Sequence, residues 1–268
     1  MSIVARPGRG SLAPFVISLW VYRGEHDHAL ERILPSPALQ LLVNLDEDAL
    51  RAYRGRGWRD ETHIGGAGVV GLRSGPCAID TREQRHIAGV AFRPGGAWPF
   101  LGGVPAHELR DVELDLSELW GQAGRRLRDQ ALDAASDSDV LQVIEDALLR
   151  RLGDATVDPA MTHAVTELAL GHRVSDTADG LGIAPATFRR RFAARVGTSP
   201  KRFARVARLH RALRAIDRRA HLSWAELAYA EGFTDQSHLI RELRTLGGLA
   251  PTDYAPRAEG ELLHVVEH

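Results

Sequence analysis

Apolar side chains occupy every second position in several short segments of the first hundred residues. Such a period is typical of strands with one buried face. Runs rich in Gly, Pro and Asp separate these segments, as expected of turns. The predicted strands lie at residues 49–54, 63–72, 77–81 and 86–93, at 15–22 with Phe15, Ile17, Leu19 and Val21 facing inward, and at 39–45 with Leu39, Leu41, Val43 and Leu45 facing inward. This pattern predicts a β-rich barrel or sandwich over residues 1–113.

From residue 114 the apolar period becomes helical. Residues 114–153 predict two helices, and a run of Ser and Asp at 134–139 separates them. These helices either cover the β-rich unit of their own chain or lie at a dimer interface. The segment 153–159, GDATVDP, combines Gly, Pro and two Asp between helical patterns, so it is the predicted domain boundary.

Beyond that boundary, two segments each predict a short helix, a tight turn and a second, arginine-bearing helix. They are residues 175–195 and 223–244. A predicted helix at 199–216 joins them, and its length of about 27 Å at 1.5 Å per residue approaches the roughly 34 Å turn of B-DNA. This spacing would place two reading helices in successive segments of the major groove.

The local signals within the two units differ. In the first, Pro185 suits the first helical position, and Phe188 and Phe192 are spaced to be buried together. In the second, Ser223 and Glu226 form a Ser-x-x-Glu capping box. The second unit therefore has the stronger helix caps.

The predicted fold class is α+β with two domains. The β-rich domain with flanking helices is followed by an all-α domain of two helix-turn-helix subdomains joined by a long helix. The expected ranges are 1–113 for the β-rich ligand-sensing domain, 114–153 for the helical segment, 154–258 for the DNA-binding domain and 259–268 for a frayed acidic tail.

Charge is segregated along the chain, although the formal net charge is only -1. Residues 1–159 hold 18 Arg against 23 acidic residues, whereas residues 160–257 hold 16 basic against 9 acidic residues. A basic segment behind an acidic one is what a DNA-binding footprint confined to one domain produces. The arginine bias itself fits either phosphate and guanine recognition or the base composition of a GC-rich genome.

The predicted DNA-contacting residues lie opposite the apolar stripes of the two reading helices. Arg and Gln side chains suit guanine and adenine, and Ile240 suits a thymine methyl group. His238 faces either the bases or solvent, and Arg195 is placed to contact the DNA backbone. The complete set is Ala186, Arg189, Arg190, Arg195, Gln236, Ser237, His238, Ile240, Arg241 and Arg244.

A small-molecule site is predicted in the β-rich half, since sandwiches and barrels often enclose a cavity. The segment 93–103 is rich in Gly and Pro and carries aromatic side chains, so it either lines such a pocket or covers one end of the barrel. The candidate ligand-binding residues are Trp20, Arg93, Trp98 and Phe100.

The enzyme alternative is a cupin-like metal site. His26, Asp27, His28 and Glu31 lie close together in the sequence, and a histidine and carboxylate set suits iron. Their spacing is not the one that fold normally uses, so we expect no metal site, no cofactor and no enzymatic activity. The single cysteine, Cys77, excludes an intramolecular disulfide.

Several motifs in order resemble the DNA-binding domain of the AraC/XylS family of bacterial transcription regulators. They are GIAPATFRRRF at 182–192, GTSP at 197–200, EGFTDQSHLIREL at 231–243 and APTDY at 250–254. Residues 10–150 resemble the uncharacterised N-terminal domain of some actinobacterial and proteobacterial members, through LPSP at 34–37, LLVN at 41–44 and FRPGGA at 92–97. In that family the N-terminal region commonly senses a small molecule or mediates dimerisation.

The sequence thus predicts a sequence-specific transcription regulator that binds double-stranded DNA under the control of a small-molecule effector. The alternatives are the metal-dependent enzyme and a nonspecific DNA-binding architectural protein. A homodimer and, for an activator, RNA polymerase are the other expected partners. With no apolar run long enough for a membrane span and no signal-peptide pattern, we expect the protein in the cytoplasm, at the nucleoid.

Overall fold

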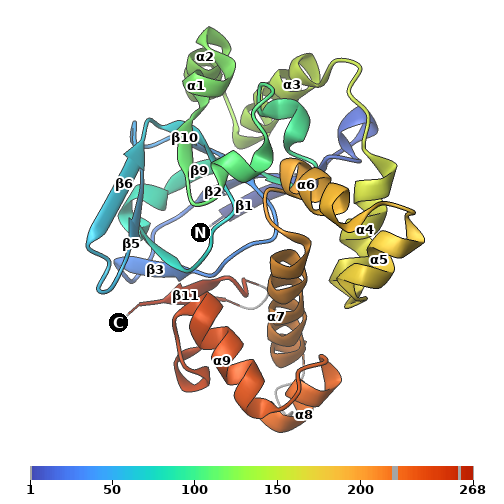
Figure 1. The fold of residues 1–268 in the computed structure, drawn as a ribbon. Coiled ribbons are helices and arrows are strands. Elements are labelled where there is room, and N and C mark those ends of the chain that lie inside the picture. Colours follow the sequence, from blue (N-terminus) through green and yellow to red (C-terminus); the bar gives the residue numbers. More distant parts are fainter. Residues whose placement is uncertain (1, 219–222, 259–260, 268) are drawn as a thin grey trace.

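In the computed structural model, a β-rich N-terminal part packs against a helical C-terminal part (Figure 1). The structure describes residues 2–218, 223–258 and 261–267. The strands are β1 (Ser2–Pro7), β2 (Val16–Arg23), β3 (Leu30–Ile33), β4 (Gln40–Asn44), β5 (Leu50–Arg54), β6 (Asp60–Ile64), β7 (Ala67–Val70), β8 (Cys77–Asp80), β9 (His86–Phe92), β10 (Glu113–Asp115) and β11 (His264–Val266).

The strands form two sheets. One has the order β1-β2-β9-β4-β7-β10 and the other the order β11-β3-β8-β5-β6. Within the described residues the pairings are antiparallel, and no strand pairing closes the two sheets into a barrel. The predicted β-rich domain is confirmed, as an open two-sheet arrangement.

Strand β4 follows the predicted alternation, with Leu41 and Val43 fully buried. In β2 the alternation fails at Ile17, whose side chain is 47% exposed. The register of β2 against β9 shifts between Val16 and Ser18, and such a bulge turns the following side chain to the other face. The prediction that Ile17 faces inward was therefore wrong. The single strand predicted at 63–72 is also interrupted, by Gly65 and Gly66 between β6 and β7.

Three helices cover the first sheet. They are α1 (Leu116–Trp120), α2 (Gln122–Leu132) and α3 (Asp137–Leu152). Their apolar stripes, including the fully buried Ile144 and Leu148, belong to the same core as Leu19, Leu41 and Val90 of the sheet. The helices therefore pack on the β-rich unit of their own chain, which is one of the two arrangements expected from the sequence.

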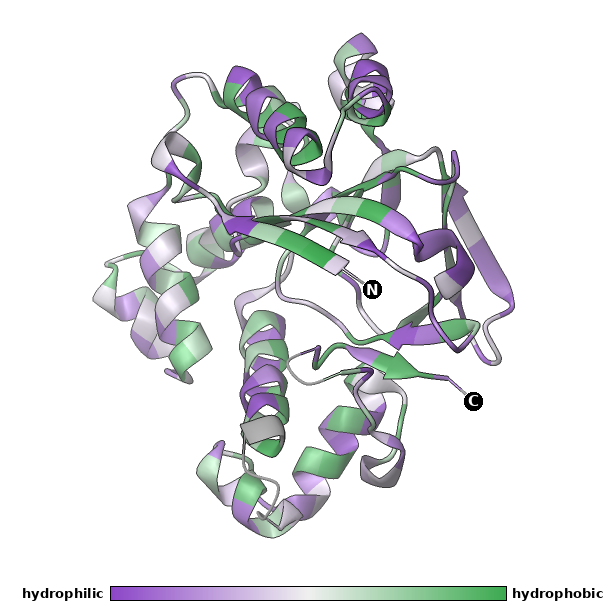
Figure 2. Ribbon diagram, turned by 180° about the vertical axis from the view of Figure 1, so that it is seen from behind, coloured by the Kyte–Doolittle hydropathy of each residue, from purple (hydrophilic) through white to green (hydrophobic). Residues whose placement is uncertain are grey.

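The C-terminal part consists of α4 (Pro159–Leu170), α5 (Val174–Gly180), α6 (Pro185–Val196), α7 (Pro200–Arg218), α8 (Trp224–Ala230) and α9 (Gln236–Gly247). Helix α7 runs from the first helical pair to the second, and its lower end lies beside α8 and α9 (Figure 1). Bands of hydrophobic and hydrophilic residues share these helices, as expected where one face is buried (Figure 2). Each helical pair has its own apolar cluster, around Phe192 in the first and Leu243 in the second.

The C-terminal segment returns to the N-terminal sheets and is not a frayed tail. Strand β11 pairs antiparallel with β3. Its central residue, Val265, lies opposite Arg32 and is only 2% exposed. Pairing at the edge of β3 satisfies backbone groups that an exposed edge would leave open. The frayed tail predicted from its acidic residues was therefore wrong for residues 261–267, while 259, 260 and 268 lie outside the described residues.

Candidate DNA-binding surface and effector cavity

Helix α6 is the second helix of the first helix-turn-helix unit. Pro185 begins it, and Phe188 and Phe192 are fully buried, with ring centroids 5.8 Å apart. This fixes the outward face of the helix, so Ala186, Arg189 and Arg190 are exposed as predicted. The preceding residue, Ala184, provides no side-chain cap. Side-chain packing, and not capping, holds this reading helix.

Helix α9 is the second helix of the other unit. Asp235 caps it by accepting a hydrogen bond from the backbone N–H of His238 at 2.7 Å, and Leu239, Leu243 and Leu246 are buried. The capping box between Ser223 and Glu226 on α8 is present. Among the predicted DNA-contacting residues of α9, Ile240 is partly buried, whereas four polar side chains are exposed: Gln236, Ser237, Arg241 and Arg244.

His238 does not belong to the exposed set. Its ring lies edge-on to Phe233 with centroids 5.4 Å apart, and its Nε2 is 3.8 Å from the Glu242 carboxylate. Its Nδ1 is 3.3 Å from the Thr234 hydroxyl. The imidazole therefore lies against the turn before α9, where Phe233 and Thr234 are, and against Glu242 one turn further along the helix. His238 is thus half-buried against its own helix, with 26% of its side chain exposed, and its contact with DNA stays a prediction.

Arg195 is also engaged within the molecule. Its guanidinium lies over the indole of Trp98, 3.8 Å from the ring centroid, in a cation–π contact between the helical part and the β-rich part. Arg191 forms an ion pair with Asp158 at 2.7 Å, at the N-terminus of α4. Both arginines hold α6 in place, so the predicted DNA-backbone contact of Arg195 does not agree with this geometry.

Arginines of α7 secure the second unit, a role that the apolar pattern alone did not predict. Arg205 donates three hydrogen bonds to the Glu242 carboxylate, two from Nε at 3.0 and 3.2 Å and one from a terminal nitrogen at 3.0 Å. Arg208 donates to the backbone carbonyl of Gly232 at 3.0 Å. These hydrogen bonds from guanidinium groups fix the orientation of α9 on the connecting helix.

A cavity of about 130 Å³ lies between the two sheets. Trp20 lines it, and Gly89 opposite Trp20 leaves room for the indole, since a Cβ at that position would come within 2.4 Å of the ring. Arg73 supplies a buried positive charge and is 3.1 Å from Glu113, which also pairs with Arg54. Apart from Arg51 and a few polar residues the walls are apolar, and the C-terminal segment contributes Leu263 and His264 to them.

The other three predicted ligand-binding residues do not line this cavity. Arg93 and Trp98 border a separate hollow beside α4 and α6, and Arg93 donates to the carbonyl of Ala13 at 2.9 Å. Phe100 is 1% exposed and stacks against Phe92 in the core. The 93–103 segment therefore covers the β-rich unit and contacts the helical part, because its aromatic side chains are buried there.

Residues 177–257 match a family described as a helix-turn-helix domain, and residues 6–115 match a domain of unknown function (DUF6597). The chain carries an AraC-type helix-turn-helix domain. The helix-turn-helix match confirms the resemblance of this part of the chain to AraC-type DNA-binding domains and supports a DNA-binding transcription regulator. No curated protein sequence matches the chain.

Solved structures of ToxT from Vibrio cholerae are similar to this chain at low sequence identity. ToxT from strain O395 is 10% identical, with a TM-score of 0.45 over 87% of this chain and 95% of that chain. ToxT bound to (E)-4-(8-methylnaphthalen-1-yl)but-3-enoic acid is 10% identical, with a TM-score of 0.47 over 95% of this chain and 98% of that chain.

The AraC-type domain is joined to the β-rich part by contacts at both of its units. Arg32 of β3 donates to the Gly247 carbonyl at the end of α9 and ion-pairs with Glu267 at 2.5 Å. On α7, the ring of His210 is 2.7 Å from the carbonyl of Pro35. Burial lowers the pKa of His210 to about 4, so the ring is neutral and donates this hydrogen bond at neutral pH.

Among the described helices, none is long and apolar enough to cross a membrane.

Proposed function

We propose that this protein is a sequence-specific transcription regulator whose DNA binding is controlled by a small molecule in the cavity between the sheets. The proposal of sequence-specific DNA binding rests on the two reading helices, whose polar faces are exposed. Arg189 and Arg190 on α6, and Gln236 and Arg241 on α9, suit hydrogen bonds to base edges and phosphates. Helix α7, about 28 Å long at 1.5 Å per residue, provides a spacing close to one turn of B-DNA.

Support for effector control comes from the wall of the cavity. Leu263 and His264 line it, and β11 continues from the segment that follows α9. A ligand that moves these side chains would also move the strand attached to the second reading helix. The charged side chains that line the cavity are those of Arg51, Arg73 and Glu113, so two positive charges face one negative charge there. We therefore propose an effector with an apolar body and one acidic group.

Replacing either reading-helix arginine tests the DNA-binding face. We expect Arg190→Ala and Arg241→Ala each to weaken binding to a cognate promoter fragment by about 1–3 kcal/mol, because each loses base-edge hydrogen bonds, and to leave binding to random DNA largely unchanged. Affinities would be measured by fluorescence anisotropy with fragments selected from the genome. Arg125→Ala, at an exposed position of α2, is the matched control and should bind as the unmodified protein does.

Equal losses on cognate and random DNA would show that these arginines contact phosphates. Equal affinity of the unmodified protein for all fragments, with a steep salt dependence, would favour the nonspecific architectural protein.

Screening small aromatic and aliphatic carboxylic acids tests the effector proposal. We expect at least one acid to change promoter affinity by about fivefold or more, the lower range of typical coupling between two sites. Arg73→Gln should reduce that change because it removes the charge in the cavity. If no acid alters DNA affinity, and residues 155–258 alone bind the promoter as tightly as the full chain, effector control is wrong.

The remaining expectations stay predictions. We propose that the protein is not an enzyme, that it forms homodimers, that it contacts RNA polymerase if it activates transcription, and that it lies at the nucleoid in the cytoplasm.

A further inference from the structure

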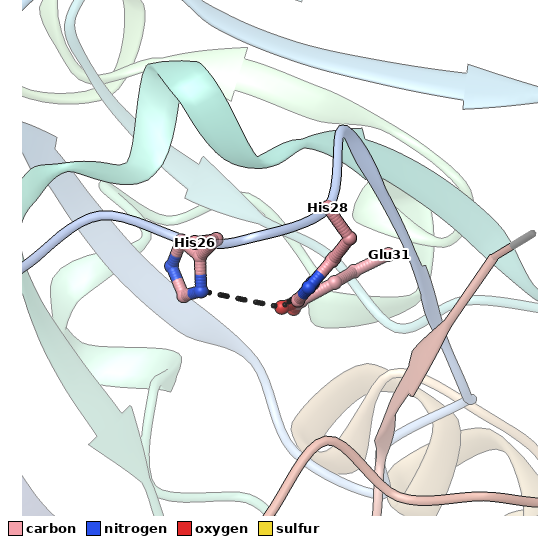
Figure 3. Close-up of side chains that lie close together, drawn as sticks. All are labelled: His26, His28 and Glu31. Atoms are coloured by element: carbon pink, nitrogen blue, oxygen red, sulfur yellow. Dashed lines mark hydrogen bonds and ion pairs between the residues drawn. The ribbon is translucent and has the colours of Figure 1, made fainter.

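A cluster of histidine and glutamate side chains lies where the loop after β2 meets β3 and the C-terminal segment. The sequence predicts no metal site at His26, His28 and Glu31, but in the structure one ligand atom from each lies within 4.8 Å of the others. His28 Nε2 is 2.8 Å from Oε1 of Glu31, and His26 Nδ1 is 3.7 Å from the same oxygen (Figure 3). Both rings thus point at one carboxylate oxygen from the same side of the loop.

His26 has polar atoms that no described residue satisfies. Its side chain is only 4% exposed and stacks on Tyr22 with ring centroids 5.1 Å apart. Nε2 is buried without a hydrogen-bond partner, and 3.7 Å from Nδ1 to Glu31 is too long for a hydrogen bond. A buried imidazole left in this way is costly. A cation between His26, His28 and Glu31 would give Nδ1 a partner.

The charges around Glu31 favour a cation. Glu31 is fully buried, and Arg257 spans its two oxygens at 2.9 and 3.1 Å. Arg257 is shared with a second carboxylate, that of Glu261 at 2.6 Å, so two acidic groups surround one guanidinium. This leaves a net negative charge beside two imidazoles.

We propose that His26, His28 and Glu31 form a binding site for a divalent transition-metal ion, with zinc as the best match. Two imidazole nitrogens and one carboxylate oxygen are a common zinc ligand set, and three protein ligands leave a fourth position open. The ion replaces the direct contact between His28 and Glu31. His264, which is 2.9 Å from the other oxygen of Glu31, acts as an outer partner that orients the carboxylate.

The test uses the tag-free, full-length protein, freed of metal with EDTA and then dialysed. Titration with Zn²⁺ by calorimetry should show one tight equivalent, and Co²⁺ should give visible absorption bands of a four- or five-coordinate site. We expect His26→Gln to weaken zinc binding by at least about 100-fold. Loss of a residue that only orients a ligand already costs up to about 100-fold, and His26 is a ligand itself. His26 makes no hydrogen bond to a described residue, so this variant should keep its fold by circular dichroism.

His63→Gln, at an exposed position of β6, is the matched control and should bind zinc as the unmodified protein does. His28→Gln provides a second variant and should also remove the Co²⁺ bands. The proposal is overturned if the unmodified protein takes up no zinc at about 100 µM, or if His26→Gln and His28→Gln bind it as tightly as His63→Gln. The proposal also fails if both variants still bind one zinc ion tightly and give the same Co²⁺ absorption bands as the unmodified protein.

Discussion

Phe192→Ala is expected to destabilise the first helix-turn-helix unit by about 3–5 kcal/mol, the usual cost of removing a buried phenylalanine ring. Phe192 is fully buried and lies between Phe188 and Phe203, with ring centroids at 5.8 and 5.6 Å. Since α6 has no side-chain cap, its position depends on these rings together with the contacts of Arg191 and Arg195. The variant should therefore also lose specific DNA binding, although Phe192 does not reach the surface.

Urea unfolding followed by circular dichroism would measure the change, with promoter affinity determined on the same samples. Tyr229→Ala removes an aromatic ring that is 89% exposed on α8, so it is the matched control and should change stability by less than about 0.5 kcal/mol. A loss below about 1 kcal/mol for Phe192→Ala would mean that α6 is held by contacts other than this aromatic cluster.

Acidification from pH 6.5 to pH 4 is expected to lower the free energy of unfolding by about 3 kcal/mol through His210 alone. Its pKa is lowered from 6.5 to about 4 by burial, and the charge of Arg214 acts in the same direction. Above pH 6.5 the ring is neutral in both states and has no effect. Between pH 6.5 and 4 the unfolded chain binds a proton that the folded protein does not, so stability falls as the pH falls.

His210→Gln separates this contribution from others. A glutamine amide can still donate to the carbonyl of Pro35 but does not titrate, so the variant should lose less stability than the unmodified protein between pH 6.5 and 4.5. Unfolding in urea at closely spaced pH values would measure this difference. Glu31, whose pKa is lowered, contributes only below about pH 4.5. Parallel pH profiles for the two proteins would contradict a buried, neutral His210.

The local elements of the reading helices could be predicted from the sequence. Pro185 at the start of α6, the capping box at Ser223 and the cap at Asp235 each depend on residues within one turn. The buried faces followed from the helical spacing of apolar residues, which also determines that Arg190 and Arg241 point outward. The fold class was predictable for the same reason, since strand and helix periods are properties of short segments.

His238 and Arg195 show where this reasoning fails. Their positions on the helices suit DNA contacts, but His238 turns toward Phe233 and Arg195 lies over Trp98. Trp98 is almost a hundred residues earlier in the chain, and no local pattern indicates such a partner. A polar residue at the rim of a helix face has two possible environments, and its tertiary neighbours decide between them.

The two-part architecture, the paired reading helices and their outward residues follow from periodicity and capping over a few turns, so the sequence alone predicts them. The pairing of the C-terminal segment with β3, the lining of the cavity by Leu263 and His264, and the convergence of His26, His28 and Glu31 are visible only in the folded protein. These features require distant parts of the chain, or both sides of a loop, to meet. Whether a strand edge is covered or a charged side chain is buried depends on the whole fold, because the free energy of each depends on its distant neighbours.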